Sequence, residues 1–568
     1  MLRRASGAAG QAATARKAAY RTALLTVLAF FLGALQTLSY VHTAWWPLPI
    51  LTLTALLLML QSASSWRSGL WGWAYGTGWL VAGVWWLFIS MHRYGGLPAP
   101  LAIAAVAALS AALSLYLGLA CAAYARWRRG RVMDAALFAG LWLLAELARG
   151  VIFTGFPWLA VGYSQIDSPI AALAPWTGVY GMGLVVALLA GLLAQAVLPL
   201  MQPLMLRLSV SPAANDPSSG EAAPSSVNGA PALPSPALSS QTRKSAGLAG
   251  LWAVSLAVSL LALMAAAAHA REFTTPVAGA GPLSVTLLQP NVGQDEKFMA
   301  DRIGQTLAWI GSALLDSVAD LVVAPETAVP LLPKQLEEAA PGFWAALQAH
   351  FGSGRAAALV GVPLGSFEAG YTNSIIGLSA ASAYRYDKHH LVPFGEFIPT
   401  GFRWFTKLMQ IPLGDFARGV PNPPSMAWRG QRLAPNICYE DLFGEELARR
   451  FIDPQVAPTI FVNLSNIGWF GDTIAVGQHL NISRMRSLEF QLPMLRATNT
   501  GATAFIDHRG VVRAQLKAFT QGSLEVRVEG RSGVTPFAWW AARWGLWPLW
   551  TLALLWVVAA TAWRRRLP

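Results

Sequence analysis

Residues 435–441 read PNICYED and place a thiol, Cys438, close to two carboxylates, Glu440 and Asp441. The apolar run at 434–437 predicts a buried β-strand that ends at this thiol. Residues 441–451 (DLFGEELARRF) predict a helix that begins just after it. A strand followed at once by a helix is typical of an α/β domain.

The chain has 2 cysteines. Cys121 falls in an apolar run that we interpret as membrane-spanning, so Cys438 has no expected disulfide partner. An unpaired cysteine is either a buried apolar residue or a nucleophile, and the residue taken alone favours neither. A helix N-terminus beside it would lower the pKa of the thiol, because unpaired N–H groups stabilise a thiolate, whereas burial would raise it, so the direction stays open. The N–H of Tyr439 would point to where an oxyanion forms, which suits acyl chemistry.

The block around this stretch, residues 271–535, alternates short apolar runs with amphipathic stretches. This pattern predicts an α/β or layered αβ domain, and about 265 residues can bury a complete core without disulfides. Helices are expected at 297–319 and 342–351. Strands are expected at 283–288, 320–324, 358–362, 373–378, 434–437, 459–463, 503–506 and 523–528.

Two further titratable residues occupy comparable positions. Glu326 closes the strand pattern LVVAPE, and Lys388 follows YRYD. Each has an ordinary explanation, because a Glu after a strand is usually solvated and a Lys beside two His is usually surface charge. Their occurrence together with the thiol favours a shared site. No cysteine or carboxylate cluster with zinc-ligand spacing surrounds His389 and His390, so we predict no metal.

The rest of the chain is strongly apolar. The whole sequence is 55% hydrophobic and 12% charged, with 25 Trp, which is typical of a membrane protein. The run at 135–148, interrupted by Glu146, is short enough to be a buried or re-entrant helix, and we place Glu146 and Arg149 near its end. Eight spans are predicted: two within 22–66 and one each at 68–91, 94–125, 135–148, 168–206, 245–270 and 544–563.

The net charge of +13 lies outside the α/β block. Residues 271–535 contain 22 basic and 23 acidic residues, whereas the rest of the chain contains 19 basic and 5 acidic residues. The excess charge therefore belongs to the membrane part, and we expect no nucleic-acid partner. With the N-terminus inside, inside loops hold 16 Lys and Arg and outside loops hold 3. Since basic residues are retained in the cytoplasm, both termini are expected there and the α/β block outside it.

A Pro/Ser/Ala-rich tract interrupts the membrane part. Such a composition cannot bury enough apolar surface to order itself, so we expect a disordered cytoplasmic linker. The expected organisation is a membrane domain of six spans at 1–210, this linker at 211–244, a seventh span at 245–270, the extracytoplasmic domain at 271–535, and an eighth span with a cytoplasmic tail at 536–568.

Three motifs in chain order resemble the Glu–Lys–Cys triad motifs of the nitrilase, or carbon–nitrogen hydrolase, superfamily: PETAVP at 325–330, KHHLVPFGEFIP at 388–399 and ICYED at 437–441. The expected spans, with GFPWLAVGYSQ at 155–165 and SNIGWFGD at 465–472, narrow the resemblance to the membrane-embedded apolipoprotein N-acyltransferases. The resemblance implies a polytopic α-helical membrane domain and an extracytoplasmic α/β nitrilase-like αββα sandwich.

The resemblance also implies residue roles. Glu326 would be the general base and Cys438 the nucleophile, while Lys388 and the N–H of Tyr439 would hold the oxyanion. The remaining implied site residues are two supporting carboxylates, Glu396 and Glu440, and a mobile substrate-facing loop with Trp469 and Phe470.

The implied reaction moves a fatty acyl chain from the sn-1 position of a phospholipid, such as phosphatidylethanolamine, to a thioester on the cysteine. The acceptor would be the free α-amino group of the N-terminal diacylglyceryl-cysteine of an apolipoprotein. No cofactor is implied, and we expect a monomer in the bacterial inner membrane with the catalytic domain in the periplasm. The apolar segment at 394–416 is either a lipid-contacting lid or ordinary core packing.

Two rival functions are open at this point. A membrane-tethered amidase or nitrilase would hydrolyse a small amide with the same triad, but it would need one anchor rather than eight spans. A transporter or lipid-binding module with an inactive outer domain would have no reason to keep Glu326, Lys388 and Cys438 together.

Overall fold

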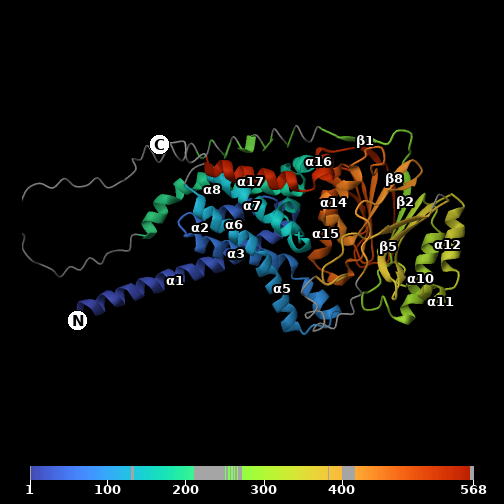
Figure 1. Cartoon of the computed structure of the whole chain (residues 1–568), viewed down its shortest axis with the longest axis horizontal. Helices are drawn as coiled ribbons and strands as arrows, with labels where there is room; N and C mark the ends of the chain where they lie inside the picture. Colours follow the sequence, from blue (N-terminus) through green and yellow to red (C-terminus); the bar gives the residue numbers. More distant parts are fainter. Residues whose placement is uncertain are drawn as a thin grey trace, which may run out of the picture.

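The computed structural model describes residues 2–129, 133–209, 271–380, 383–399 and 416–562, together with scattered positions between 250 and 266. The predicted linker at 211–244, most of the predicted seventh span at 245–270 and the centre of the apolar segment at 394–416 lie outside these residues. The chain forms two parts: apolar helices in the centre of Figure 1 and a sandwich of two sheets on its right.

The helical part consists mostly of long apolar helices. Cys121 is buried within one of them. The helices are α1 (Leu2–Gln36), α2 (Leu48–Leu60), α3 (Ser65–Val84), α4 (Leu87–Ile89), α5 (Ala99–Leu113), α6 (Leu115–Trp127), α7 (Met133–Val151), α8 (Ala174–Ser209) and α17 (Trp547–Ala562).

Within the described residues, five helical segments are long and apolar enough to cross a membrane, and two bent pairs bring the number to seven. These seven overlap seven of the eight predicted spans. The segment over the short run at 135–148 extends to Met133–Thr154 and is 22 residues long. The two bent pairs are α3 with the segment Leu87–Tyr94, bent by 63°, and α16 (Pro536–Trp544) with α17, bent by 94°.

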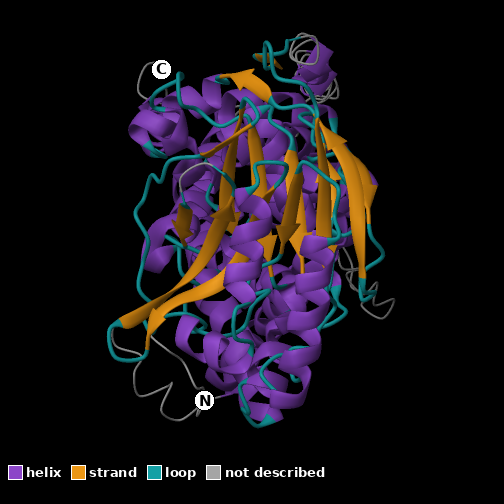
Figure 2. Ribbon diagram, turned by 90° about the vertical axis from the view of Figure 1, so that its right-hand side faces the viewer, coloured by secondary structure: helices purple, strands orange, loops and turns teal. Residues whose placement is uncertain are grey.

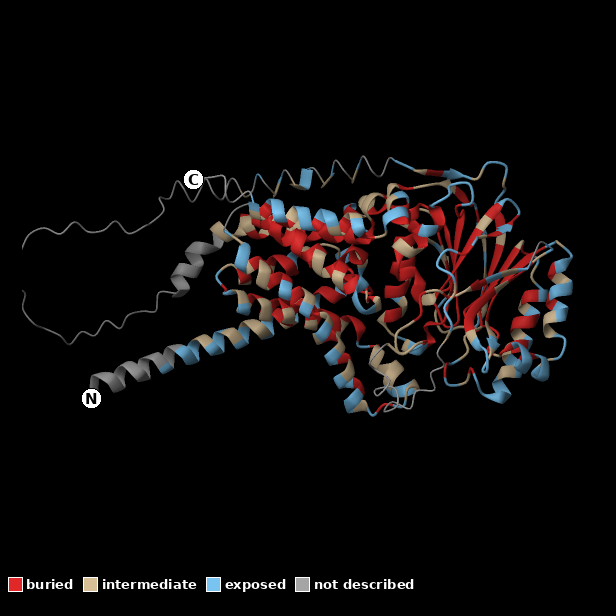
Figure 3. Cartoon of the chain, viewed as in Figure 1, coloured by how far each residue is buried: buried red, intermediate tan, exposed pale blue. Residues whose placement is uncertain are grey.

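The outward faces of these helices carry large apolar side chains. Figure 3 shows exposed residues along the outside of the bundle. Among the exposed large apolar residues of these helices, Ile103, Leu119 and Leu555 are 61%, 70% and 62% exposed. Water would disfavour such a surface, whereas the hydrocarbon of a bilayer would cover it at no cost. The helical part is therefore built to be surrounded by lipid.

The other part contains two six-stranded sheets. The first sheet has the order β13-β2-β3-β4-β5-β6, with β2, β3 and β4 parallel. Its strands are β13 (Gly522–Val528), β2 (Leu283–Gln289), β3 (Leu321–Ala324), β4 (Ala357–Ser366), β5 (Gly370–Leu378) and β6 (Tyr384–Asp387).

The second sheet has the order β12-β11-β10-β9-β8-β7, with β8, β9 and β10 parallel. Its strands are β12 (Val512–Gln515), β11 (Ala504–Ile506), β10 (Met494–Thr498), β9 (Ile460–Ser465), β8 (Gln431–Ile437) and β7 (Met426–Trp428). A small third sheet pairs β1 (Thr274–Pro276) with β14 (Arg531–Gly533).

Helices cover both outer faces of the paired sheets (Figure 2). On the far side lie α10 (Ala300–Leu315), α11 (Pro333–Ala339) and α12 (Phe343–Gly352). On the other side α14 (Gly444–Ala448), α15 (Ile474–Phe490) and α16 lie between the sheets and the membrane helices. Apolar residues from both sheets form one buried cluster that includes Val285, Val323 and Val462. The result is the predicted αββα sandwich.

One predicted element is wrong. Residues 441–451 do not form a single helix: a 3₁₀ turn at Cys438–Leu442 is followed by the short α14 and a second 3₁₀ turn at Arg449–Phe451. Phe443, with φ −104° and ψ 77°, leaves the helical region and separates the first turn from α14. No continuous helix therefore points its N-terminus at the thiol.

Candidate active site

Glu326, Lys388 and Cys438 come together from the ends of three strands. Glu326 follows β3 and Lys388 follows β6 in one sheet, whereas Cys438 follows β8 in the other. The Lys388 Nζ lies 3.4 Å from the Glu326 Oε1 and 2.8 Å from the Glu396 Oε1. The sandwich thus brings together three side chains that are distant in the sequence, at strand ends, where open α/β sheets commonly bind ligands.

Buried amides hold the two carboxylates in place. The Asn373 Nδ2 donates to the Glu326 Oε1 at 2.8 Å and to the Glu396 Oε1 at 2.9 Å. The backbone N–H of Asn466 donates to the Glu326 Oε2 at 2.7 Å. Glu396 also accepts from the N–H of Val392 at 2.8 Å. Both oxygens of each carboxylate therefore have fixed partners, which preorganises the site.

Electrostatics keep Lys388 charged. Burial would lower the pKa of Lys388, but the carboxylates of Glu396 and Glu326 outweigh it and hold the pKa well above its ordinary value. A lysine that remains an ammonium ion can stabilise a developing negative charge, whereas it cannot act as a base.

Cys438 as a whole residue is partly buried. Burial raises its pKa to about 12, and the negative charge of Glu326 adds to this, while Lys388 acts in the opposite direction. The helix expected to lower this pKa is broken, so burial decides the direction. The thiol is protonated at neutral pH and needs a base to become a nucleophile.

The backbone at the site adopts an uncommon conformation. Cys438 has φ 51°, and Thr327, next to Glu326, has φ 52°. Phe394, close to Glu396, has φ 61°. Non-glycine residues in this region cost about 1–3 kcal/mol each and persist where the surroundings determine them, which is common at active sites.

Glu440 connects the segments that carry Lys388 and Cys438. Its Oε1 accepts from the N–H groups of His389 at 2.7 Å and His390 at 3.1 Å. Its Oε2 accepts from the N–H of Ile437 at 2.7 Å and from the Tyr386 hydroxyl at 2.5 Å. Glu440 is 4% exposed. It therefore holds the strand ends together.

The other predicted site residues lie at the junction with the membrane helices. The Tyr439 hydroxyl donates to the Gly155 carbonyl at 3.3 Å. The Phe470 ring packs against Trp86, with ring centroids 4.2 Å apart. Trp469 is 40% exposed and forms a T-shaped ring contact with Tyr94. The segment SNIGWFGD thus sits on the membrane part.

Sequence reasoning missed Lys297. This residue is 4% exposed, and its Nζ donates to the Glu326 carbonyl at 3.3 Å. Burial lowers its pKa to about 8, against the raising effect of Glu326 and Cys438. Nothing in the sequence DEKFMA distinguishes it from surface charge. Asn466, in contrast, belongs to a segment that the sequence already singled out.

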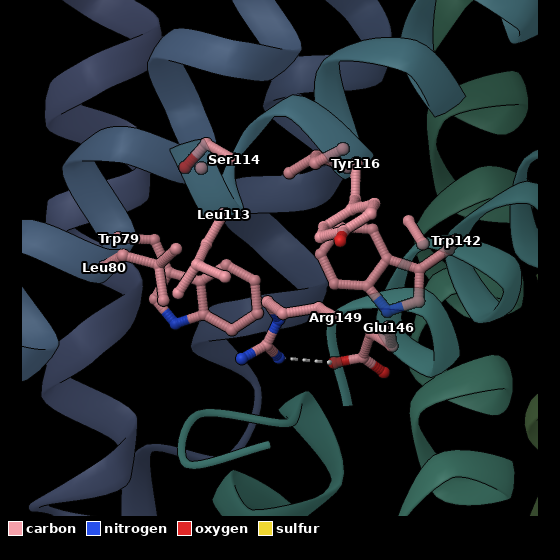
Figure 4. A pocket seen from close by; sticks show the side chains of 11 residues that line it. Trp79, Leu80, Leu113, Ser114, Tyr116, Trp142, Glu146 and Arg149 are labelled. Atoms are coloured by element: carbon pink, nitrogen blue, oxygen red, sulfur yellow. Dashed lines mark ion pairs between the residues drawn. The ribbon is translucent and has the colours of Figure 1, made fainter. Parts of the chain in front are cut away.

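Glu146 and Arg149 lie near the C-terminal end of α7, as predicted. Both are nevertheless buried, at 3% and 4% exposure. Each forms a hydrogen bond to the loop that follows α7. The Glu146 Oε1 accepts from the N–H of Val161 at 2.7 Å, and the Arg149 Nη1 donates to the Phe156 carbonyl at 2.8 Å. Figure 4 shows the two side chains, with their ion pair at 3.7 Å, beside a small cavity between the helices.

The fold and the site together define a membrane-embedded enzyme of the carbon–nitrogen hydrolase class. Residues 284–533 match the family model described as carbon–nitrogen hydrolase. Residues 13–192 match the model described as apolipoprotein N-acyltransferase N-terminal domain.

Curated relatives extend over almost the whole chain. The apolipoprotein N-acyltransferase of Verminephrobacter eiseniae is 50% identical over 88% of this chain and 89% of its own length. That of Ralstonia nicotianae is 41% identical over 95% of this chain and 93% of its own length. The chain belongs to the apolipoprotein N-acyltransferase family.

Solved structures show a more distant similarity. A mutant of the amidase from Nesterenkonia sp. AN1 aligns with a TM-score of 0.35 and 16% identity, over 49% of this chain and 99% of that one. The carbon–nitrogen hydrolase from Helicobacter pylori G27 aligns with a TM-score of 0.32 and 16% identity, over 47% of this chain and 94% of that one.

Proposed function

We propose that this enzyme transfers a fatty acyl chain from the sn-1 position of a membrane phospholipid to the N-terminal diacylglyceryl-cysteine of apolipoproteins. The observation that carries the proposal is the position of Cys438. It lies close enough to Glu326 and Lys388 for their charges to act on its thiol, and the hydroxyl of the next residue, Tyr439, bonds to the Gly155 carbonyl in a loop of the membrane helices. We propose that lipids of the bilayer reach the thiol at this junction.

The first step forms a thioester. Glu326 takes the proton from Cys438, and the thiolate attacks the carbonyl carbon of the sn-1 ester. The ester C–O bond breaks, and the leaving oxygen takes the proton from Glu326, so a lysophospholipid departs. A base is needed because the pKa of the thiol is raised to about 12.

The second step forms an amide. The α-amino group of the diacylglyceryl-cysteine attacks the thioester, the C–S bond breaks, and the proton lost by the nitrogen passes through Glu326 to the sulfur. Both steps place negative charge on the former carbonyl oxygen. The Lys388 ammonium and the N–H of Tyr439 stabilise that oxygen, with Glu396 and Glu440 fixing the groups around it.

The lipid donor explains the membrane domain. Removing an acyl chain from the bilayer costs about 0.8 kcal/mol per methylene group, so both substrates must stay partly in the membrane during the reaction. Phosphatidylethanolamine is the proposed donor, and Trp469 and Phe470 contact the substrates. We further propose that the enzyme is a monomer whose domains have the bounds predicted from the sequence.

The topology follows from the charges. Basic residues are concentrated in the loops that this arrangement places inside the cell, which favours cytoplasmic termini and a periplasmic sandwich in the inner membrane of a bacterium. Amide hydrolysis by a tethered amidase is less well supported, because a single anchor would serve it and the described residues offer up to seven spans.

The proposal is tested by incubating the purified full-length protein with phospholipid alone. We expect intact-mass and peptide mass spectrometry to find one acyl adduct, located on Cys438 and released by hydroxylamine. Cys438→Ser should form no thioester, whereas Cys121→Ser should acylate normally. Wild-type protein that remains folded and forms no adduct would contradict the proposal.

A further inference from the structure

Helix α15 lies between the sandwich and the membrane helices, and two consecutive residues on it connect the two parts. Gln478 and His479 are 3% and 1% exposed. Gln478 bonds to the membrane part, whereas His479 bonds to the backbone of Cys438. Burying two polar side chains is costly unless every polar atom is paired, so their bonds determine what they do.

Gln478 uses both ends of its amide on the membrane part. Its Oε1 accepts from the indole N–H of Trp158 at 2.8 Å and from that of Trp86 at 3.1 Å. Its Nε2 donates to the Gly83 carbonyl at 3.1 Å. An indole can only donate and a carbonyl can only accept, so these partners fix the orientation of the amide. Gly83 lies just before the 63° bend that ends α3.

The partners of His479 fix its tautomer. The Arg496 Nη2 lies 2.8 Å from the His479 Nδ1, and because a guanidinium only donates, Nδ1 accepts. The proton of the neutral imidazole is therefore on Nε2, which faces the Asp441 Oδ1 at 2.9 Å and the Cys438 carbonyl at 3.3 Å. Burial lowers the pKa of His479, in agreement with a neutral ring.

The network around His479 is rigid. Asp441 is fully buried and also accepts from the Ser483 hydroxyl at 2.5 Å. Arg496, also fully buried, donates to the Ser483 Oγ at 2.6 Å and to the Asn463 Oδ1 at 3.1 Å. A side chain held by this many partners has one position, so His479 moves only if α15 moves.

This network fixes the backbone conformation of Cys438 and therefore the position of its thiol. Cys438 has φ 51°, and its carbonyl faces the His479 Nε2 and the Asn463 Nδ2, the latter at 3.4 Å. The peptide after Cys438 carries the N–H proposed for the oxyanion, so a rotation of this peptide would misplace that donor and the thiol together. A displacement of about 1 Å can cost about a hundredfold in rate.

We propose that Gln478 and His479 are positioning residues. They couple the packing of α15 against α3 and Trp158 to the conformation of the Cys438 backbone. The inference rests on the proposed acyl transfer, and it adds that the membrane helices orient the nucleophile as well as admit the lipid. Neither side chain touches the reacting atoms.

The test measures acylation of Cys438 by saturating phospholipid in a single turnover, with full-length Gln478→Leu, His479→Gln and the double variant. We expect each single variant to acylate at least tenfold more slowly, with the half-saturating phospholipid concentration changed less than threefold. The double variant should be at most threefold slower than the slower single variant, because both substitutions break one pathway.

Gln36→Leu is the matched control. Gln36 is also fully buried and bonds to Tyr75 of α3, but it makes no bond to α15 among the bonds of the described residues. Its variant should acylate within twofold of wild type. If Gln478→Leu does not fold, Trp158→Phe removes one donor to the same amide and should give the same slowing.

Three results would overturn the inference: slowing of less than tenfold, a higher half-saturating concentration in place of slower acylation, or effects that multiply in the double variant. Equal slowing by Gln36→Leu would also overturn it, since general loosening of α3 would then suffice. If the wild-type protein acylates normally, any of these results refutes the coupling but not the proposed function. A wild type without adduct refutes the proposed function and the coupling with it.

Discussion

A cysteine whose pKa is raised to about 12 by burial is a weak nucleophile until its proton is removed. Cys438 depends on a neighbouring base for this reason, and Glu326 occupies that place, held by Asn373 and Asn466. Lys388 cannot serve as the base, since its carboxylate neighbours keep it charged. The roles proposed for the three residues rest on these surroundings.

The raised pKa predicts how the free thiol reacts with a small alkylating reagent. Only the thiolate reacts, so the rate at Cys438 should rise about tenfold per pH unit from pH 7 to 9.5 without levelling off. Mass spectrometry after timed exposure to iodoacetamide measures it. Val318→Cys, at a fully exposed position, should level off near pH 8.5. A plateau for Cys438 below pH 9 would contradict the raised pKa.

Replacement of the base should abolish most activity without loss of fold. We expect Glu326→Gln to slow single-turnover acylation by about a thousandfold, the range of a lost general base. The amide keeps the size of the side chain and can still accept from Asn373. Glu338→Gln, on the exposed surface of α11, should acylate normally. A loss of less than tenfold in Glu326→Gln would assign the proton transfer to another group.

The motifs predicted the triad, but not its environment. Glu326 and Cys438 each follow a predicted strand, whereas no strand was predicted before Lys388, where the structure has β6. Lys297 and Asn373 could not be identified, because a buried lysine or asparagine looks the same in sequence as an exposed one. The pKa of Cys438 was beyond reach as well, since it depends on burial by distant segments.

At the scale of elements, the sandwich depends on carboxylates that bridge strand ends. Glu440 accepts four hydrogen bonds from the end of β6, from the two histidines after Lys388 and from the end of β8. These bonds replace the continuous helix that would otherwise organise residues after Cys438. The spacing between Lys388 and Cys438 is therefore set by one side chain.

Removal of this bridge should weaken both stability and activity. Glu440→Ala leaves buried donors unpaired, which costs about 3 kcal/mol or more. We expect a lower thermal unfolding midpoint, by about 5 °C or more, together with slower acylation. Differential scanning fluorimetry in detergent measures the first effect. Glu338→Ala is the control, and an unchanged midpoint in Glu440→Ala would show that the bridge is dispensable.

Apolar periodicity predicted eight strands of the sandwich and the helices α10 and α12. The strands β6, β7, β10 and β12 and the helix α15 were not predicted. Of these, β10 and α15 bury charged and polar residues, among them Arg496, His479 and Glu489. Their partners come from other elements, so no local pattern identifies them. The predicted helix at 441–451 failed for a related reason: the bonds of Glu440 and Asp441 determine the backbone there.

At the scale of the whole molecule, polar bonds join the membrane helices to the sandwich. The Trp540 indole donates to the Trp176 carbonyl at 2.9 Å, and the Glu489 Oε1 accepts from the N–H of Val179 at 2.8 Å. Arg93 forms an ion pair with Asp295 across the same junction. The sandwich is thus fixed to the bundle by polar bonds at several points.

The charge distribution predicts the orientation of this assembly. In intact cells, a membrane-impermeant maleimide should label Val318→Cys in the sandwich, whereas Lys17→Cys in α1 should react only after permeabilisation. The chain's own cysteines are buried or partly buried, and the unsubstituted protein measures their background. Labelling in the opposite pattern would place the sandwich in the cytoplasm and contradict the proposed topology.

Acyl transfer, rather than hydrolysis, is the central claim, and a chase of the acyl-enzyme tests it most directly. Protein loaded from phospholipid is mixed with a synthetic diacylglyceryl-cysteine peptide, and the thioester on Cys438 and the acylated peptide are followed by mass spectrometry. We predict that the thioester disappears at the rate at which the N-acylated peptide forms, and that a peptide with a blocked α-amino group leaves it intact. Release of free fatty acid without peptide acylation would contradict the account.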